Sequence, residues 1–520
     1  MNEAYLRDRR LVLATLGGIA AIALLLRLAG TGERTLSWDE AYHVQLVLLP
    51  STTEMHGALL ANPPSDPLYA LLLRAWAALA GTTDQAIRLP SILAGAATAP
   101  AAAWLGWELT LSRRVALASA SLVAIAPYAV EFGQEASLYA FATLTTTLAL
   151  AALWRWRRTG RRSDGALAVL LSIVAVYSHY VVPAVLALVA FTSLSRLGRP
   201  RRVSVRAMAV AAGIVLLAWL PWLVPMLMSW FSTDARTALA RTASPHELLG
   251  ALSQYASGTG ALLERVRPLQ MLGIAAAGPL LARGWLVGGR PGLGGLRVVV
   301  LVAGVLFVGP WLASVITGHW LFVAHLMLFM LPAVGVVLVS GWLAPGEGVA
   351  TTGARSRTDR RSTVRLAASL AAAGLLLAQV GGLAVNAIEP PHGDDGSRDL
   401  AISLRAAATP GEPVFIAPAE LQPIFDQYWD GPLYGLPTDL DLRRLYSIED
   451  HSVAFERSID RFSEITRGAS RAWLVYEPAR EGDALFVAWL RQQARVVPRA
   501  SQQFADLYEV RLPETPSLRN

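Results

Sequence analysis

The chain has 520 residues, of which 54% are hydrophobic and only 16% are charged, and its mean hydropathy is +0.43. A soluble globular protein carries about 25% charged residues, so the composition argues against a soluble multidomain enzyme, and the abundance of apolar residues excludes a disordered chain. Cysteine is absent, which excludes disulfides and thiolate metal sites.

The positive charge is unevenly distributed along the chain. The formal net charge is +7, and all 45 basic residues are arginines. Residues 1–388 contain 31 arginines and 17 acidic residues, whereas residues 389–520 contain 14 arginines and 21 acidic residues. A basic, apolar body is typical of a membrane protein with arginine-rich cytoplasmic loops. The sequence therefore predicts a membrane domain over 1–388, an extracytoplasmic domain over 389–520, and no nucleic-acid partner.

Long apolar runs predict a mainly α, polytopic bundle. A spanning helix needs about 20 mostly apolar residues. The sequence has about eleven such runs, at 11–29, 87–111, 115–130, 136–154, 165–179, 181–195, 207–229, 268–288, 297–317, 320–343 and 366–388. The first run follows three arginines and no small-residue cleavage site comes after it. We therefore interpret it as a retained helix and not as a signal peptide.

Arginine-rich short loops predict the orientation of this bundle. Segments 155–162 and 195–206 each contain five arginines and no acidic residue, and loops of this kind stay in the cytoplasm. The run at 67–81 is apolar but short, with Arg74 in its middle. If this run crossed the membrane, the arginine-rich loop at 155–162 would be placed on the outer side. The run is therefore predicted to lie flat on the outer surface. The protein is then a multi-pass protein of a cell membrane, bacterial by expectation, with a cytoplasmic N-terminus.

The outer loop at 30–86 carries the first chemical signal. Its motif SWDEAYH, residues 37–43, places Asp39 and Glu40 just outside the first helix. Two adjacent carboxylates at a membrane boundary are costly unless they are solvated or used. Asp39 is a candidate general base toward an acceptor hydroxyl. Glu40 is a candidate for orienting a sugar or, with Asp39, for binding a divalent cation such as Mg²⁺ or Mn²⁺.

The segment after residue 388 lacks long apolar runs and predicts a small α/β domain. Helical patterns lie at 398–408, 421–429 and 483–494, and strand patterns lie at 414–418, 471–477 and 495–512. Strands that alternate with helices favour an α/β layer. The segment has no glycine-rich phosphate loop, so we interpret it as a cap on the bundle or as an aid to acceptor binding.

Further segments follow the acidic motif in a fixed order. They are NPPSDPLYALLLRAW (62–76), IRLPSILAG (87–95), YAVEFGQEASLYAFATL (128–144), VYSHYVVPAVL (176–186) and GHWLFVAHLMLFMLPAVGVVL (318–338). This series resembles the GT-C superfamily of membrane glycosyltransferases. The nearest branch is the family 39-like group, which includes protein O-mannosyltransferases and lipid A aminoarabinose transferases. The resemblance covers nearly the whole chain and implies a sugar donor linked to polyprenyl phosphate.

The resemblance also implies roles for individual residues. Asp39 matches the expected base of the family's acidic motif. The residues expected around the acceptor or the sugar are Tyr42, His43, Asp66, Tyr69, Gln134, Glu135, Tyr139, His179 and Tyr180. Because the leaving phosphate needs its charge stabilised, the candidates for that contact are Arg88, Arg265, Arg267 and His325. A single displacement would invert the anomeric centre.

The sequence departs from the family pattern at three positions. Asp66 stands where family members often have histidine, Ser137 stands where an arginine commonly follows Gln-Glu, and His325 begins the segment that replaces a late Arg-Tyr pair. These losses leave two alternatives open, a transporter or flippase of lipid-linked sugars and a non-catalytic member of the same fold. The sequence also leaves open whether the acceptor is a glycan, a lipid or a protein.

Overall fold

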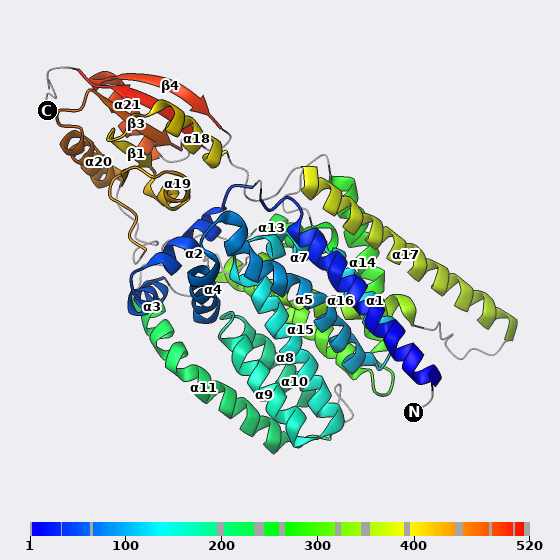
Figure 1. Cartoon of the computed structure of the whole chain (residues 1–520). Helices are drawn as coiled ribbons and strands as arrows, with labels where there is room; N and C mark the ends of the chain where they lie inside the picture. Colours follow the sequence, from blue (N-terminus) through cyan, green and yellow to red (C-terminus); the bar gives the residue numbers. More distant parts are fainter. Residues whose placement is uncertain are drawn as a thin grey trace.

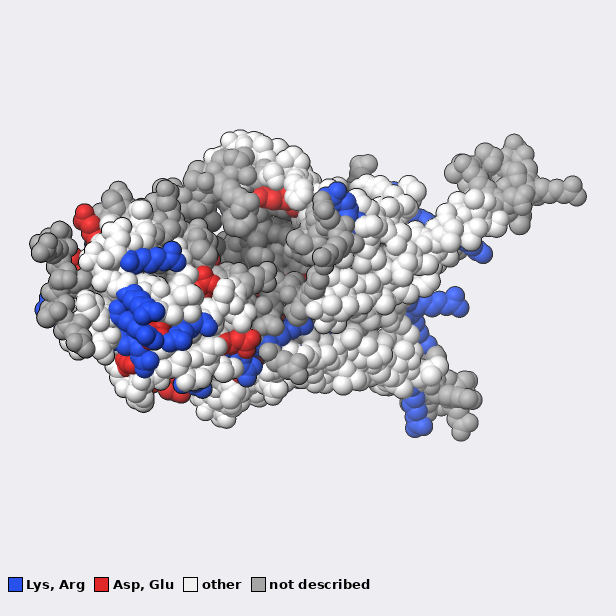
Figure 2. Space-filling view, turned by 90° about the horizontal axis from the view of Figure 1, so that it is seen from above, with Lys and Arg blue, Asp and Glu red and all other residues white. Residues whose placement is uncertain are grey.

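The computed structural model describes residues 3–32, 34–62, 66–194, 202–232, 244–258, 266–317, 324–344, 354–388, 396–442, 451–477, 481–502 and 505–513. The chain forms a bundle of long helices with a smaller, sheet-containing domain at one end (Figure 1). The N-terminus lies at the opposite end of the bundle. Figure 2 shows few charged side chains over the middle of the bundle and many on the sheet-containing domain, as expected for a bundle immersed in lipid.

The bundle helices follow the predicted apolar runs closely. They are α1 (Glu3–Leu28), α5 (Asp84–Thr110), α6 (Arg113–Ile125), α7 (Pro127–Gln134), α8 (Leu138–Thr159), α9 (Arg162–Val176), α10 (Val182–Leu194), α11 (Val205–Ser232), α14 (Arg267–Val287), α15 (Gly294–Thr317), η2 (Ala324–Met330), α16 (Leu331–Leu343) and α17 (Ala354–Ile388). The other helices before residue 389 are α2 (Trp38–Leu48), α3 (Thr52–Ala61), α4 (Pro67–Ala80) and α13 (Pro245–Ser257).

Several of these helices can cross a membrane. Among the described residues, five helices are long and apolar enough to do so, and the bent pair α6–α7 counts as a sixth. The other predicted runs form helices that are shorter or less apolar. The chain is thus a multi-pass membrane protein, whereas the expected eleven crossings and the flat position of α4 stay predictions.

The run predicted at 115–130 is divided in two because Pro127 has no N–H with which to continue α6. The two helices meet at an angle of 56°. The buried guanidinium of Arg27, from α1, donates to the carbonyls of Ala124 (3.2 Å) and Ala129 (3.1 Å) on the two sides of the break. Gly95 and Gly133 leave room for this side chain, since a Cβ at either position would lie within 2.7 Å of its Nε. The break is therefore a fixed feature that sets the direction of α7.

The predicted C-terminal α/β domain is confirmed. Its sheet has the order β2-β1-β3-β5-β4, with β1 parallel to β2 and β3, and β5 antiparallel to β3 and β4. The strands are β1 (Val414–Ala417), β2 (Leu433–Gly435), β3 (Arg471–Tyr476), β4 (Arg495–Ser501) and β5 (Asp506–Arg511). The helices are α18 (Ser397–Ala407), α19 (Gln422–Tyr428), α20 (His451–Ile465) and α21 (Glu481–Gln493). The sequence analysis missed β2 and α20.

The C-terminal domain and the outer loop share one hydrophobic core, in which Leu36 and Val44 pack with Phe425 of α19. Hydrogen bonds reinforce this contact. The Tyr428 hydroxyl donates to the Asp84 carboxylate (2.8 Å) and accepts the Leu36 N–H (3.0 Å). The Trp38 indole N–H donates to the Glu420 carbonyl (2.9 Å). The C-terminal domain therefore holds the chain on both sides of the start of α2.

Replacing Tyr428 by Phe should loosen this junction. The change leaves the Asp84 carboxylate and the Leu36 N–H without their partner, at an expected cost of about 1–3 kcal/mol. We expect a lower melting temperature of the purified protein in detergent and faster proteolysis between α17 and α18. Tyr434→Phe is the matched control, because its ring packs on Phe415 in the same domain. Equal melting temperatures for the two variants would contradict this account of the junction.

Candidate active site

The acidic motif forms the first turn of α2. The Ser37 hydroxyl accepts the Glu40 N–H (3.3 Å), and the Glu40 carboxylate accepts the Ser37 N–H (2.9 Å). This reciprocal capping box is a helix-start signal, and it explains why SWDE begins a helix here. Asp39 lies in the same first turn, where the helix dipole favours a negative charge.

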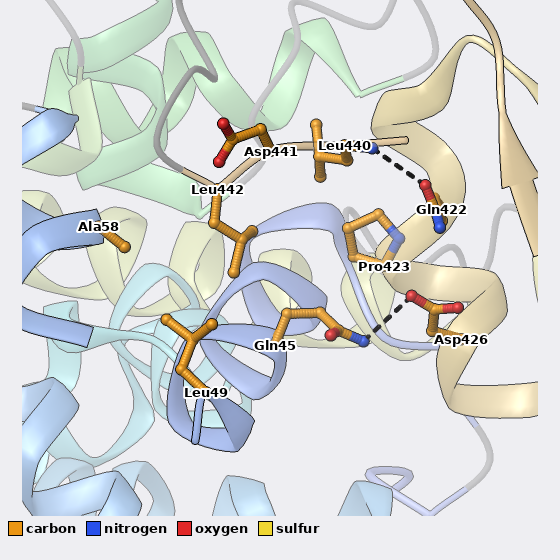
Figure 3. A pocket seen from close by; sticks show the side chains of 9 residues that line it. All are labelled: Gln45, Leu49, Ala58, Gln422, Pro423, Asp426, Leu440, Asp441 and Leu442. Carbon is orange, nitrogen blue, oxygen red and sulfur yellow. Dashed lines mark hydrogen bonds between the residues drawn. The ribbon is translucent and has the colours of Figure 1, made fainter. Parts of the chain in front are cut away.

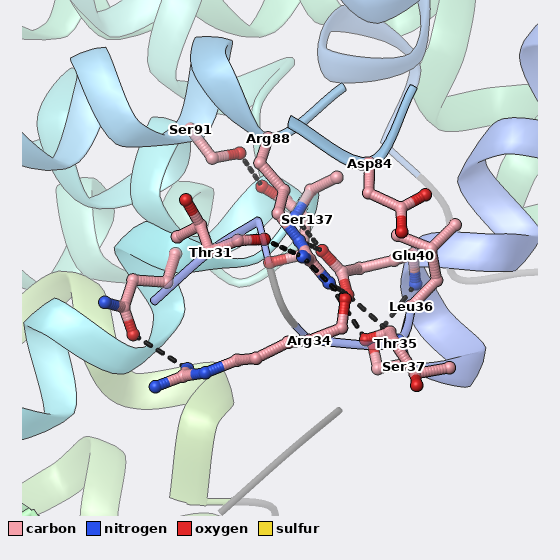
Figure 4. Close-up of polar contacts among 12 residues, drawn as sticks. Thr31, Arg34, Thr35, Leu36, Ser37, Glu40, Asp84, Arg88, Ser91 and Ser137 are labelled. Carbon is pink, nitrogen blue, oxygen red and sulfur yellow. Dashed lines mark hydrogen bonds and ion pairs between the residues drawn. The ribbon is translucent and has the colours of Figure 1, made fainter. Parts of the chain in front are cut away.

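Glu40 and Arg88 form a buried ion pair next to this turn (Figure 4). Both side chains are 2% exposed, and Nε of Arg88 lies 2.7 Å from Oε1 of Glu40. The other Glu40 oxygen accepts from Nη2 of Arg88 (2.8 Å), and the Ala136 N–H also donates to Glu40 (2.8 Å). The remaining N–H groups of Arg88 donate to the carbonyls of Thr31, Arg34 and Thr35.

These contacts correct two expectations from the sequence. All five N–H groups of Arg88 have protein acceptors, so the geometry does not support the expected contact with the donor phosphate. Both oxygens of Glu40 accept two hydrogen bonds each, so the geometry does not support a contact with a metal or a sugar either. The pair instead fixes the backbone of residues 31–40 against α5 and α8, and with it the position of Asp39.

Replacing Glu40 by Gln should leave the Arg88 cation buried and unpaired. Breaking one partner of a buried ion pair costs about 3–5 kcal/mol, so we expect a large fall in melting temperature and in the yield of folded protein. The double variant Glu40→Gln/Arg88→Met should recover part of the loss. Arg405→Gln, which breaks the exposed Arg405–Asp430 pair, serves as the control and should cost less than about 1 kcal/mol.

Tyr69 and Gln134 were expected at the acceptor or the sugar, and the structure gives both a packing role. The Tyr69 side chain is buried, and its hydroxyl is 3.0 Å from the Ser91 hydroxyl. The Gln134 amide donates to two carbonyls at the end of α1, those of Leu26 and Ala29, and its oxygen accepts from Arg34 (2.8 Å). Gln134 thereby ties α7 to α1.

Asp39, Tyr42 and His43 lie on the first turns of α2 and are half-buried. Tyr42 stacks on Trp38 with ring centroids 5.7 Å apart. Nδ1 of His43 lies 2.6 Å from the Asp39 carbonyl oxygen. We assign the proton to this nitrogen, which leaves Nε2 as an acceptor. Burial lowers the pKa of His43 despite the nearby Asp39 charge, so the ring is neutral at physiological pH.

Four aromatic side chains from three segments, α8, the turn at 179–180 and η2, meet within electrostatic range of Asp39. The ring of Tyr139 lies 4.8 Å from that of His325 and 6.2 Å from that of His179, and His179 stacks on Tyr180 at 4.7 Å. The Val181 N–H donates to Nδ1 of His179 (3.2 Å), so its proton lies on Nε2. The Tyr139 hydroxyl interacts electrostatically with four groups, Asp39, Asp66, Glu135 and Tyr180. The structure thus brings together eight of the expected residues, namely Asp39, Tyr42, His43, Asp66, Glu135, Tyr139, Tyr180 and His325, with His179 at their edge.

Asp66 precedes α4 and is the second carboxyl group of this cluster. Its side chain is buried, and burial raises its pKa to about 8, although the Tyr180 N–H donates to the carboxylate and opposes the shift. The group therefore carries a proton over most of the physiological range and can donate a hydrogen bond. Asp66 thus adds a protonated carboxyl group to the cluster near Tyr139.

The raised pKa of Asp66 predicts a pH-dependent stability. The folded protein binds this proton more tightly than the unfolded chain, so protonated Asp66 stabilises the fold. This contribution to the free energy of unfolding is complete below about pH 4 and is lost as the pH rises toward 8. Asp66→Asn cannot titrate. The melting temperature of this variant minus that of the unmodified protein should therefore be larger at pH 8 than at pH 5. The exposed Asp399→Asn is the control, and an unchanged difference between the two pH values would contradict the assignment.

Two further arginines and a metal ion were also expected at the site. Arg265 is outside the described residues. Arg267 is exposed at the start of α14. In the part of the chain that the structure describes, no three His, Asp or Glu side chains are placed to hold a metal ion.

Two residues of the site were missed. Glu131 on α7 is buried and lines a small recess with Arg34 and Glu135. Glu131 lies inside α7 and Glu135 follows the end of that helix in extended conformation, so only the fold brings the two carboxylates to one recess. Arg34 had no distinctive sequence signal. Only the folded chain brings its guanidinium to Gln134.

An apolar cavity of about 440 Å³ lies within the helix bundle. It is enclosed by helices α6 and α13–α17, and its polar lining includes Tyr255 and Gln379. The Tyr255 ring lies 5.5 Å from that of Tyr128, which contacts Phe132 at 5.1 Å. Phe132 in turn contacts Tyr139 at 5.1 Å. A chain of aromatic contacts therefore connects this cavity to the acidic site.

Comparison with known proteins agrees with this architecture. ArnT from Cupriavidus metallidurans, solved with undecaprenyl phosphate, is similar with a TM-score of 0.61 at 14% identity, over 96% of this chain and 98% of its own. The oligosaccharyltransferase AglB from Archaeoglobus fulgidus, solved with an inhibitory peptide and a dolichol-phosphate, has a TM-score of 0.51 at 12% identity, over 96% of this chain and 74% of its own. No curated protein matches the chain in sequence.

The chain therefore shares its overall fold with these two membrane proteins. Residues 62–224 match the family model of dolichyl-phosphate-mannose-protein mannosyltransferases. The matched stretch begins before α4 and ends within α11, and it contains Asp66, Tyr139, His179 and Tyr180 of the cluster.

Proposed function

We propose that this protein is a glycosyltransferase that moves a sugar from a polyprenyl-phosphate donor to an acceptor hydroxyl on the extracytoplasmic face of the membrane. The observation that carries the proposal is the placement of Asp39, on a rigidly held helix start, against a half-buried cluster of tyrosines and histidines. A membrane bundle of the GT-C fold surrounds this cluster. The arginine-rich loops support the outer location, because such loops face the cytoplasm.

The donor is inferred from the similar structures and from the apolar cavity. ArnT was solved with undecaprenyl phosphate and AglB with a dolichol-phosphate, and both ligands are polyprenyl phosphates. The cavity between α6 and α13–α17 has room and apolar walls for part of such a tail. A lipid held there would present its phosphate and sugar near Tyr139 and His325.

The proposed reaction is a single displacement. Asp39 accepts the proton of the acceptor hydroxyl as its oxygen attacks the anomeric carbon. The bond between that carbon and the phosphate oxygen breaks, and polyprenyl phosphate leaves with the bonding electron pair. Attack and departure on opposite faces invert the anomeric centre.

The residues around Asp39 have supporting roles in this proposal. Neutral His43 and protonated Asp66 offer hydrogen-bond partners to sugar hydroxyls. Because all N–H groups of Arg88 are engaged by the protein, we assign the phosphate contact to His325 of the cluster and to Arg34, which lines the recess with Glu131 and Glu135. Arg34 donates only one described hydrogen bond, to Gln134, and His325 is half-buried beside Tyr139.

Replacing Asp39 by Asn should remove the base while preserving shape. We expect transfer from a labelled polyprenyl-phosphate sugar to fall by about 10²–10⁴-fold, with donor affinity and melting temperature unchanged. The assay uses purified protein with a membrane extract as the source of acceptors. Glu54→Gln, in the same outer loop, is the control.

Two outcomes would contradict the proposal in different ways. Full transfer by the Asp39→Asn variant would show that Asp39 is not the base, but it would not contradict the glycosyltransferase activity. Movement of the lipid-linked sugar across a vesicle membrane without a new glycosidic bond would instead support a flippase.

A further inference from the structure

A cavity of about 370 Å³ lies at the junction of α2, α3 and the C-terminal domain (Figure 3). Gln45 and Leu49 line it from α2, and Ala58 lines it from α3. The C-terminal domain contributes residues of α19 and of the segment 440–442. Its volume falls within the range of about 300–1,000 Å³ typical of small-molecule sites. Both halves of the protein are needed to form it.

The lining of this cavity is polar on one side and apolar on the other. Figure 3 shows the carboxylate of Asp426 and the amides of Gln45 and Gln422 on the side of α19. Leucine, alanine and proline side chains form the remaining walls, and the second carboxylate is that of Asp441. Sugars combine hydroxyl groups with apolar ring faces, so this lining is complementary to a sugar unit.

Asp426 differs from those carboxylates of its domain that pair with arginine. Asp430 and Asp439 pair with arginines at 2.6 and 2.5 Å, and Glu412 pairs with Arg471 at 2.6 Å. The contact described for Asp426 is a long one, 3.4 Å, to the neutral amide of Gln45. Partial burial and the nearby Asp439 charge raise the pKa of Asp426 to about 6. Its oxygens are therefore available for donors from a ligand.

The cavity is also connected to the proposed catalytic helix. Gln45 follows Asp39 by six residues on α2, which corresponds to about 9 Å along the helix axis. The other wall belongs to α19, whose Tyr428 holds the start of the same helix. A ligand in the cavity would therefore contact both the element that carries the base and the domain that positions it.

We propose that this cavity is an acceptor subsite that binds a hydroxyl-rich sugar unit without phosphate or carboxylate groups. The inference rests on the proposed function and narrows its acceptor to a glycan. The described lining residues include two carboxylates and no arginine, which disfavours an anionic group. A neutral or amino sugar can donate hydrogen bonds to these carboxylates, those of Asp426 and Asp441. Leu49, Pro423 and Leu442 would contact the apolar face of its ring.

The test is direct binding of defined sugars to the purified, full-length protein. The probes are a neutral mannotriose, the amine-bearing trisaccharide of glucosamine, a phosphorylated mannotriose and a tripeptide of lysine, each measured by calorimetry without donor. We expect saturable binding of a neutral or amine-bearing sugar and at least tenfold weaker binding by Asp426→Asn and by Asp426→Arg. Asp430→Asn, on the same domain, is the matched control and should bind as the unmodified protein does.

Each outcome decides the proposal. Preference for the phosphorylated sugar or for the lysine peptide, or no binding of any sugar, would overturn it, as would equal binding by the Asp426 variants. Asp39→Asn separates this inference from the proposed function. That variant should lose transfer and retain sugar binding, so failure of catalysis and failure of the subsite give different results.

Discussion

The buried ion pair between Glu40 and Arg88 is the interaction on which the rest of the site depends. One carboxylate completes the helix cap of α2, neutralises a guanidinium from α5 and accepts the Ala136 N–H at the start of the segment leading to α8. The guanidinium in turn holds three carbonyls of residues 31–35. Because each group is saturated by protein partners, the pair holds the backbone rigidly around Asp39.

The C-terminal domain also stabilises the outer loop. The loop lies outside the bundle core, and much of its apolar surface is covered by α19 and the sheet behind it. Tyr428 and Glu420 then satisfy polar groups on both sides of the helix start. None of the described residues of the C-terminal domain belongs to the cluster around Tyr139. The domain nevertheless helps to position the helix that carries Asp39, and it supplies one wall of the cavity at the junction.

Arginine has two separate structural uses in this chain. Exposed arginines gather in short loops, where they are expected to set the orientation in the membrane. Arg27 and Arg88 are buried, and each satisfies backbone carbonyls that helix breaks or loops leave without partners. The sequence does not distinguish an exposed arginine from one that is buried against backbone carbonyls. For this reason Arg88 was expected to bind a phosphate.

The sequence by itself determined the membrane bundle and the α/β domain, and it pointed to Asp39 as a candidate base. Hydropathy, periodicity and a helix-start signal are local properties, so they can be recognised without the tertiary structure. Only the tertiary structure decided which polar residues are engaged by the protein. Tyr69, Gln134, Glu40 and Arg88 take partners that are far away in the sequence, whereas Asp66 and the aromatic cluster come together from four separate segments. Such pairing depends on how helices pack, and no local pattern encodes it.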